Sequence, residues 1–144
     1  MSTSDKKALP LKAIRSTLVR RAGAGPDASA VAEATLGTLR QLVAQLTPVI
    51  GVRGTHALLT YSLHQANHAF TWLEGDHKDI TTLLASIKTR LEAREPADAL
   101  EASCALLAIF TDLLGDLIGE SLTQRLLAPV WAPTPPASVS EITP

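Results

Sequence analysis

The sequence predicts an all-α protein: an up-down bundle of four main helices, with a short basic helix at the N-terminus and a proline-rich tail at the C-terminus. Leucine and alanine, which favour helices, account for 45 of the 144 residues. Valine and isoleucine together number only 14, and aromatic residues make up 3% of the chain. Because β-sandwiches and barrels depend on those residue types, the composition argues against them.

Three parts follow one another along the chain, and they differ in charge. We expect a basic arm with a Gly/Pro linker at residues 1–26, the helical bundle at 27–128 and the proline-rich tail at 129–144. Residues 1–22 carry six cationic side chains against one anionic, a net charge of +5. The remaining residues carry seven against thirteen, a net charge of −6. The formal net charge of −1 therefore conceals two regions of opposite sign.

The basic arm contains the first predicted helix, from Leu9 to Arg21. Leu11, Ile14 and Leu18 are spaced i, i+3, i+7 and form one apolar stripe on a helix of about three turns. We expect the helix to end at the Gly-Ala-Gly-Pro run of residues 23–26, because glycine and proline interrupt regular structure. The apolar stripe is then free to pack on the bundle.

The next predicted helix begins where Asp27 or Ser29 can accept a hydrogen bond from the unpaired N–H groups of its first turn. Pro48 disturbs its last turn, and the Gly-Val-Arg-Gly run at residues 51–54 ends it. Its apolar residues step by three and four, as the buried face of a helix does. They are Leu36, Leu39, Val43, Leu46 and Ile50.

Two more apolar stripes predict the second and third main helices. Thr55 can cap the first of them, and Asp76 or Asp79 can cap the other after a turn at residues 74–77. The two stripes are Leu59, Leu63, Ala66, Phe70 and Leu73, and then Ile80, Leu84, Ile87 and Leu91. Short connections of this kind place successive helices antiparallel.

The fourth main helix is the most apolar. Pro96 suits its first turn, where the missing N–H would be unpaired anyway. From Cys104 to Ile118, 11 of 15 residues are apolar, and they cover more than one face of the helix. A helix of this type is contacted by several neighbours, so we expect it at the centre of the bundle. Gly119 ends or bends it, and residues 121–127 continue it or form a short extra helix.

A candidate interface lies on this central helix at Ala108, Asp112, Gly115 and Gly119. Small residues at four-residue spacing allow another helix to approach closely. That helix belongs either to the same molecule or to a second copy or partner protein. An acidic ridge runs along the same helix, formed by Asp112, Asp116 and Glu120. The ridge is either the solvent-facing strip of the helix or a docking face for cationic groups, including the basic arm of the same chain.

The histidines are the candidate ligand or metal residues. His64 and His68 share a helix face because they are four residues apart, and His77 follows in the predicted turn. Three such side chains can hold a zinc ion if the turn folds back, and a histidine pair can contact haem. The alternative is that this face is simply exposed to water. We expect no bound metal and no cofactor.

Arg53 and Gly54 form a candidate anion site, because they precede a predicted helix N-terminus. The alternative is a plain loop, since the segment has no P-loop or dinucleotide-binding motif. Cys104 is expected to be a buried, unreactive thiol. No nucleophile motif or complete set of metal ligands appears, so we do not expect an enzyme.

The sequence therefore favours a non-catalytic, bacterial-type regulatory or adaptor domain that acts by helix-to-helix association, as a homodimer or with a partner protein. The first alternative is a small-ligand, metal or haem sensor that uses His64 and His68. The second is attachment to an anionic membrane or nucleic acid through residues 6–21. We expect a cytoplasmic protein, because the chain shows no signal-peptide pattern or membrane-spanning stretch and has one cysteine.

Overall fold

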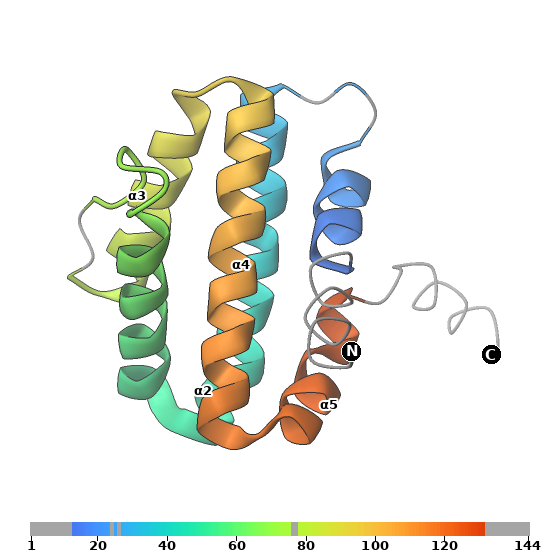
Figure 1. The fold of residues 1–144 in the computed structure, drawn as a ribbon, viewed down its shortest axis with the longest axis vertical. Coiled ribbons are helices and arrows are strands. Elements are labelled where there is room, and N and C mark those ends of the chain that lie inside the picture. Colours follow the sequence, from blue (N-terminus) through green and yellow to red (C-terminus); the bar gives the residue numbers. More distant parts are fainter. Residues whose placement is uncertain (1–12, 24, 26, 76–77, 132–144) are drawn as a thin grey trace, which may run out of the picture.

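The computed structural model describes residues 13–23, 25, 27–75 and 78–131, and within them every regular element is helical. The all-α prediction is therefore confirmed. Residues 13–22 form an N-terminal helix. The other helices are α2 (Ala28–Ala66), α3 (Ile80–Glu92), α4 (Pro96–Ile118) and α5 (Glu120–Trp131), packed side by side as Figure 1 shows.

Helix α2 consists of two limbs that meet at Gly51. There the backbone has φ 79° and ψ 167°, a conformation that is available almost only to glycine. The first limb (residues 28–50) and the second limb (residues 52–66) run in opposite directions in Figure 1. The predicted break is thus confirmed, but it takes one residue instead of four. Thr55 consequently lies inside the second limb, where its hydroxyl donates to the Gly51 carbonyl at 2.8 Å instead of capping the helix.

Two of the predicted caps are present. The Asp27 carboxylate accepts from the Ala30 N–H, and the Asp79 carboxylate accepts from the Thr82 N–H, each at 2.8 Å. Pro96 occupies the start of α4, as expected. The second limb of α2 ends at Ala66, several residues before its predicted apolar stripe does, and the chain continues through turns in which Leu73 is nevertheless buried.

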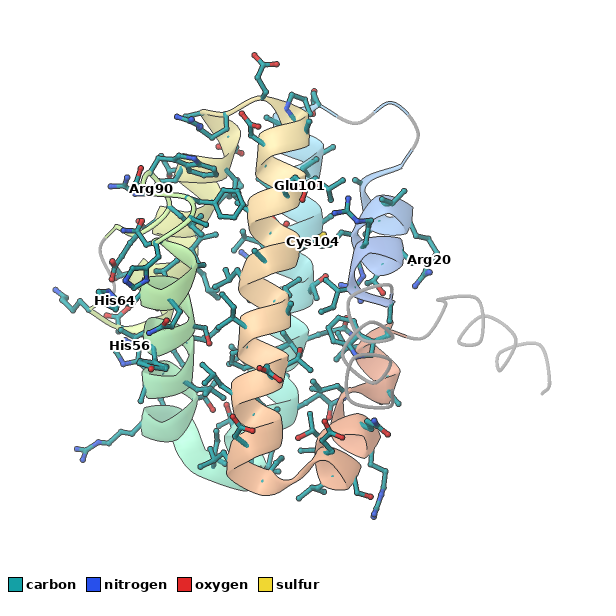
Figure 2. All side chains as sticks on the ribbon, in the orientation of Figure 1. Arg20, His56, His64, Arg90, Glu101 and Cys104 are labelled. Carbon is teal, nitrogen blue, oxygen red and sulfur yellow. The ribbon has the colours of Figure 1, made fainter. Side chains whose placement is uncertain are left out.

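The connection from α2 to α3 is held against α3. Arg90 of α3, labelled in Figure 2, donates to the Trp72 carbonyl at 3.0 Å. The Arg94 guanidinium lies 4.6 Å from the centre of the Trp72 ring, within the range of a cation–π contact. A side chain at Gly75 would overlap the Ser86 hydroxyl and the Arg90 guanidinium. A residue other than glycine at position 75 would therefore require the Ser86 and Arg90 side chains to move.

Helix α4 packs against α2 and α5 and lies in the middle of the molecule in Figure 1. Gly119, with φ 93° and ψ 148°, ends it, so α5 is a separate helix. The buried residues of α4 occupy one side of the helix along most of its length. They are Ala99, Ala102, Ser103, Cys104, Leu106, Leu107, Phe110 and Leu114.

The N-terminal helix and the end of α5 belong to the same core. Ile14, Leu18 and Val130 are each 0% exposed. The packed helical unit consequently begins before residue 27 and extends past residue 128, the limits that the sequence predicts for the bundle. Burial of Val130 explains the C-terminal difference, because α5 continues through Pro129 to Trp131. The rest of the proline-rich tail, from residue 132, lies outside the described residues.

Candidate functional site

The predicted interface residues lie along the side of α4 that faces away from the core. Asp112 and Asp116 are exposed, and Ala108 and Gly115 are half-buried. Leu117, in the last turn of the same helix, is 61% exposed. The small and acidic side chains thus share one face of α4, whereas Leu117 lies on another side of the helix; the described chain covers none of them completely.

The two glycines of this face have different structural roles. Gly119 has a positive φ and lies in the turn between α4 and α5, where a Cβ atom would meet no atom of the described residues within 4 Å. Its conformation, and not helix packing, explains the glycine there. At Gly115 a Cβ atom would meet only Cγ of Glu120 among the described residues, at an ordinary 3.6 Å. The predicted close approach of another helix of the same molecule is therefore not found at Gly115 in the described part of the chain.

The turn at Gly119 also divides the predicted acidic ridge. Asp112 and Asp116 belong to α4, whereas Glu120 is the first residue of α5. All three side chains are exposed. The three carboxylates thus lie at the surface, and Arg15, Arg20 and Arg21 of the N-terminal helix contact other parts of the molecule.

Three arginines of the N-terminal helix reach groups of the bundle. Arg15 forms a 3.0 Å ion pair with Glu101 of α4, on the side of α4 toward the N-terminal helix in Figure 2. Arg20 donates to the Trp131 carbonyl at 3.1 Å. Arg21 donates to the Thr38 hydroxyl and the Val130 carbonyl, each at 3.2 Å, and also to Gln41.

These contacts give the basic arm a structural role. Carbonyls at the C-terminus of a helix lack helical partners and carry partial negative charge, so Arg20 and Arg21 stabilise the end of α5. Burial lowers the pKa of Arg21, and the hydrogen bond with Glu101 raises the pKa of Arg15. The lysines that the membrane and nucleic-acid alternatives also require, Lys6, Lys7 and Lys12, lie outside the described residues.

The histidine face is open to solvent. The His64 side chain is 59% exposed, and its Nδ1 lies 3.3 Å from Oε1 of Glu74. Nδ1 of His68 lies 3.2 Å from the Gln65 carbonyl oxygen, and the two imidazole rings meet edge to face at 5.5 Å. His77 falls outside the described residues, among which no three potential metal ligands come together.

A fourth histidine, which the sequence reasoning missed, lies on the same limb. His56 and His64, both labelled in Figure 2, line a shallow open groove together with Tyr61 and Glu74. Nε2 of His56 is 3.5 Å from the Thr60 hydroxyl. The available signal was the four-residue repeat of polar residues at 56, 60, 64 and 68, which places them along one side of a helix.

The candidate anion site lies in the first turn of the second limb. Arg53 is exposed, and Gly54 is half-buried. A Cβ atom at Gly54 would stand 3.2 Å from Cβ of Ile50, so the sharp kink at Gly51 explains the glycine. Gly54 therefore has a packing role, and Arg53 remains an exposed cation.

Several polar groups are buried between the N-terminal helix, the first limb and α4. Cys104 is buried as predicted, and burial raises the pKa of its thiol. The Thr35 hydroxyl bonds to the Ser103 hydroxyl at 2.8 Å. The Thr17 hydroxyl is also buried but has no hydrogen-bond partner in the described part of the chain. Sequence reasoning missed Thr17, Thr35 and Ser103, because threonine and serine in a helix do not reveal which face they occupy.

Exposed apolar side chains gather at one end of the molecule. The turn at Gly51 and the turn at Gly119 both lie at the bottom of Figure 1. The described residues expose six large apolar side chains, and four of them are close to these two turns in the sequence. We call these four the apolar end: Val49, Val52, Leu117 and Leu122.

Comparison with protein families, curated proteins and solved structures finds no match to this chain. In the part of the chain that the structure describes, no helix combines the length and the hydropathy that crossing a bilayer requires. We therefore infer function from the surfaces and contacts described above.

Proposed function

We propose that this chain is a non-catalytic regulatory or adaptor domain that acts by helix-to-helix association through the exposed face of α4. The observation that carries the proposal is Gly115. It is a glycine inside a regular helix, and neither a positive φ nor a close neighbour in the described structure requires it. Glycine costs a helix interior about 1 kcal/mol relative to alanine, so its presence needs a reason outside the described part of the chain.

A second helix that packs across α4 supplies that reason. Small residues let two helix backbones approach each other, and Ala108 and Gly115 are both half-buried on this side of α4. Asp112 and Asp116 provide charges that orient an incoming helix. The arrangement is suited to a homodimer or to a partner helix with cationic residues.

The proposal includes the finer features that the sequence predicts. The four main helices of the up-down bundle are the two limbs of α2, then α3 and α4, with a proline-rich segment following α5. Their support is the reversal of chain direction at Gly51 and the short connections between the helices. We also propose the cytoplasm as the compartment, and a buried free thiol at Cys104 suits a reducing environment.

The test compares Gly115→Leu with Gly115→Ala by light scattering coupled to size-exclusion chromatography. We expect the wild-type protein to have a mass above 15.2 kDa at micromolar concentration. Leucine at position 115 should return the mass to that of the monomer, because its side chain holds the second helix away, whereas alanine should weaken association less. Circular dichroism should show unchanged helix content for both variants, since a side chain at position 115 meets no obstacle among the described residues. Masses that do not respond to Gly115→Leu would contradict the proposal.

A further inference from the structure

The apolar end is built around the two turns that reverse the chain. Val49 and Val52 flank Gly51, while Leu117 and Leu122 flank Gly119. Val52 and Leu117 are each 61% exposed, the largest fractions among the exposed large apolar side chains of the described residues. Figure 1 shows both turns at the same end of the bundle, so the four residues beside them lie at that end. Apolar side chains gathered in this way are typical of an association surface.

Opposite charges flank this surface. Arg53 follows Val52 in the first turn of the second limb, and Asp116 precedes Leu117 in the last turn of α4. Both side chains are exposed. Neither forms an ion pair within the described part of the chain, where the ion pairs join other residues. The apolar end thus carries an exposed cation on the α2 side and an exposed anion on the α4 side.

We propose that the apolar end binds the apolar end of a second copy of this chain, across a two-fold axis. The inference rests on the proposed function, names a second copy as the partner and adds the apolar end to the face of α4 as a contact surface. In a two-fold interface, a contact between residue i of one subunit and residue j of the other occurs twice, once in each direction. A cation and an anion on opposite sides of one apolar surface are therefore complementary to the same surface turned by half a revolution. Arg53 pairs with Asp116 of the partner subunit, and the reciprocal pair forms at the same time.

The charge pattern is what selects a second copy over another partner. An apolar end with one sign of charge would repel its own copy and suit an oppositely charged protein. Here Arg53 and Asp116 carry opposite signs on the two sides of the surface, so each can meet the other in a second copy. The four apolar side chains supply the area removed from water, and the two ion pairs set the register of the copies.

The decisive experiment reverses these charges one at a time and then together. The dimer dissociation constant is measured by sedimentation equilibrium for Arg53→Asp, for Asp116→Arg and for the double variant. Each single reversal places like charges opposite each other at two positions and should weaken the dimer about tenfold or more. The double variant restores both pairs with exchanged signs, so its dissociation constant should return to within about threefold of the wild type. Single variants that dimerise as well as the wild type, or a double variant weaker than both, would overturn the inference.

A matched pair of substitutions tests the apolar contact independently. Val52→Asp places a charge in the centre of the proposed contact, whereas Val19→Asp places one on an exposed valine of the N-terminal helix, away from it. Because both valines are exposed, both variants should fold, and only Val52→Asp should be monomeric. A wild-type protein that is monomeric at every concentration contradicts the homodimer form of the proposed function as well. An association that Gly115→Leu abolishes and Val52→Asp leaves intact contradicts this inference alone.

Discussion

Gly51 shows how one residue sets the path of the chain. Its φ of 79° and ψ of 167° allow α2 to reverse direction, and no neighbour among the described residues opposes a side chain there within 4 Å. Gly51→Ala should therefore lower the free energy of unfolding by about 1–3 kcal/mol through backbone strain alone. Gly115→Ala is the matched control at a helical glycine and should raise it by about 1 kcal/mol, measured in the monomer. Urea unfolding measures the change in the free energy of unfolding for both variants. Equal changes for Gly51→Ala and Gly115→Ala would contradict the assigned roles of the two glycines.

Replacing each of two buried threonines, Thr17 and Thr35, should change the free energy of unfolding in opposite directions. Thr17→Val removes a buried hydroxyl that has no partner among the described residues and should raise the free energy of unfolding by about 1 kcal/mol. Thr35→Val removes the same atom from the hydrogen bond with Ser103, leaves that serine short of a partner and should lower the free energy by about 1–3 kcal/mol. Chemical denaturation of the two variants measures both changes. Destabilisation by Thr17→Val as large as that by Thr35→Val would show that the Thr17 hydroxyl has a partner in solution.

At the scale of the element, the N-terminal helix depends on Arg21 as well as on its apolar stripe. Arg21→Met keeps the aliphatic stem but removes the hydrogen bonds with Thr38, Gln41 and the Val130 carbonyl of α5. We expect a loss of about 1–2 kcal/mol in the free energy of unfolding. Arg40→Met, at an exposed arginine of the first limb, should have almost no effect in the same urea titration. If Arg21→Met and Arg40→Met had the same free energy of unfolding, the contacts of Arg21 would contribute nothing to stability.

The start of α3 should respond to acid through Asp79. Hydrogen bonds from Thr82 to the carboxylate lower the pKa of Asp79 below its ordinary value of 3.8. A carboxyl whose pKa is lower in the folded state stabilises the fold above the unfolded pKa, and this stabilisation disappears as the pH falls through the folded pKa. The stability advantage of the wild type over Asp79→Asn should consequently shrink as the pH is lowered from neutrality through the ordinary pKa of 3.8. A difference that stays constant over this range would contradict the assignment.

The sequence predicts the helices better than their contacts, for a physical reason. The apolar stripes place Ile14 and Leu18 on one side of the N-terminal helix, and both are buried as expected. The partners of Arg20 and Arg21 include backbone carbonyls of α5, which every residue possesses. No pattern of side chains marks those carbonyls, so the contacts emerge only when the helices are placed in space.

The same limit applies to the candidate site. Composition and spacing predict that Asp112 and Asp116 are exposed on the most apolar helix, and the structure agrees. Spacing alone treats Gly115 and Gly119 as equivalent, yet one lies in a regular helix and the other has the positive φ of a turn. The apolar end escapes prediction because its residues come from two turns that are far apart in the chain and close only in the folded molecule.

For the whole molecule, two groups of cationic and anionic side chains can be distinguished: those that form contacts within one molecule and those that we propose form contacts between molecules. The arginines of the N-terminal helix satisfy Glu101 and the end of α5 within one molecule. Arg53 and Asp116 make no such pair in the described part of the chain, and the proposed dimer pairs them between molecules. A net charge of −1 is thus compatible with strong local complementarity.

Sedimentation equilibrium of the unmodified protein over a wide concentration range tests the proposed self-association most directly. We predict a reversible rise in mass from 15.2 kDa toward twice that value, weakened by added salt because the ion pairs between copies are exposed at their rim. A mass of 15.2 kDa at every concentration and salt level would contradict self-association through the apolar end and the exposed face of α4.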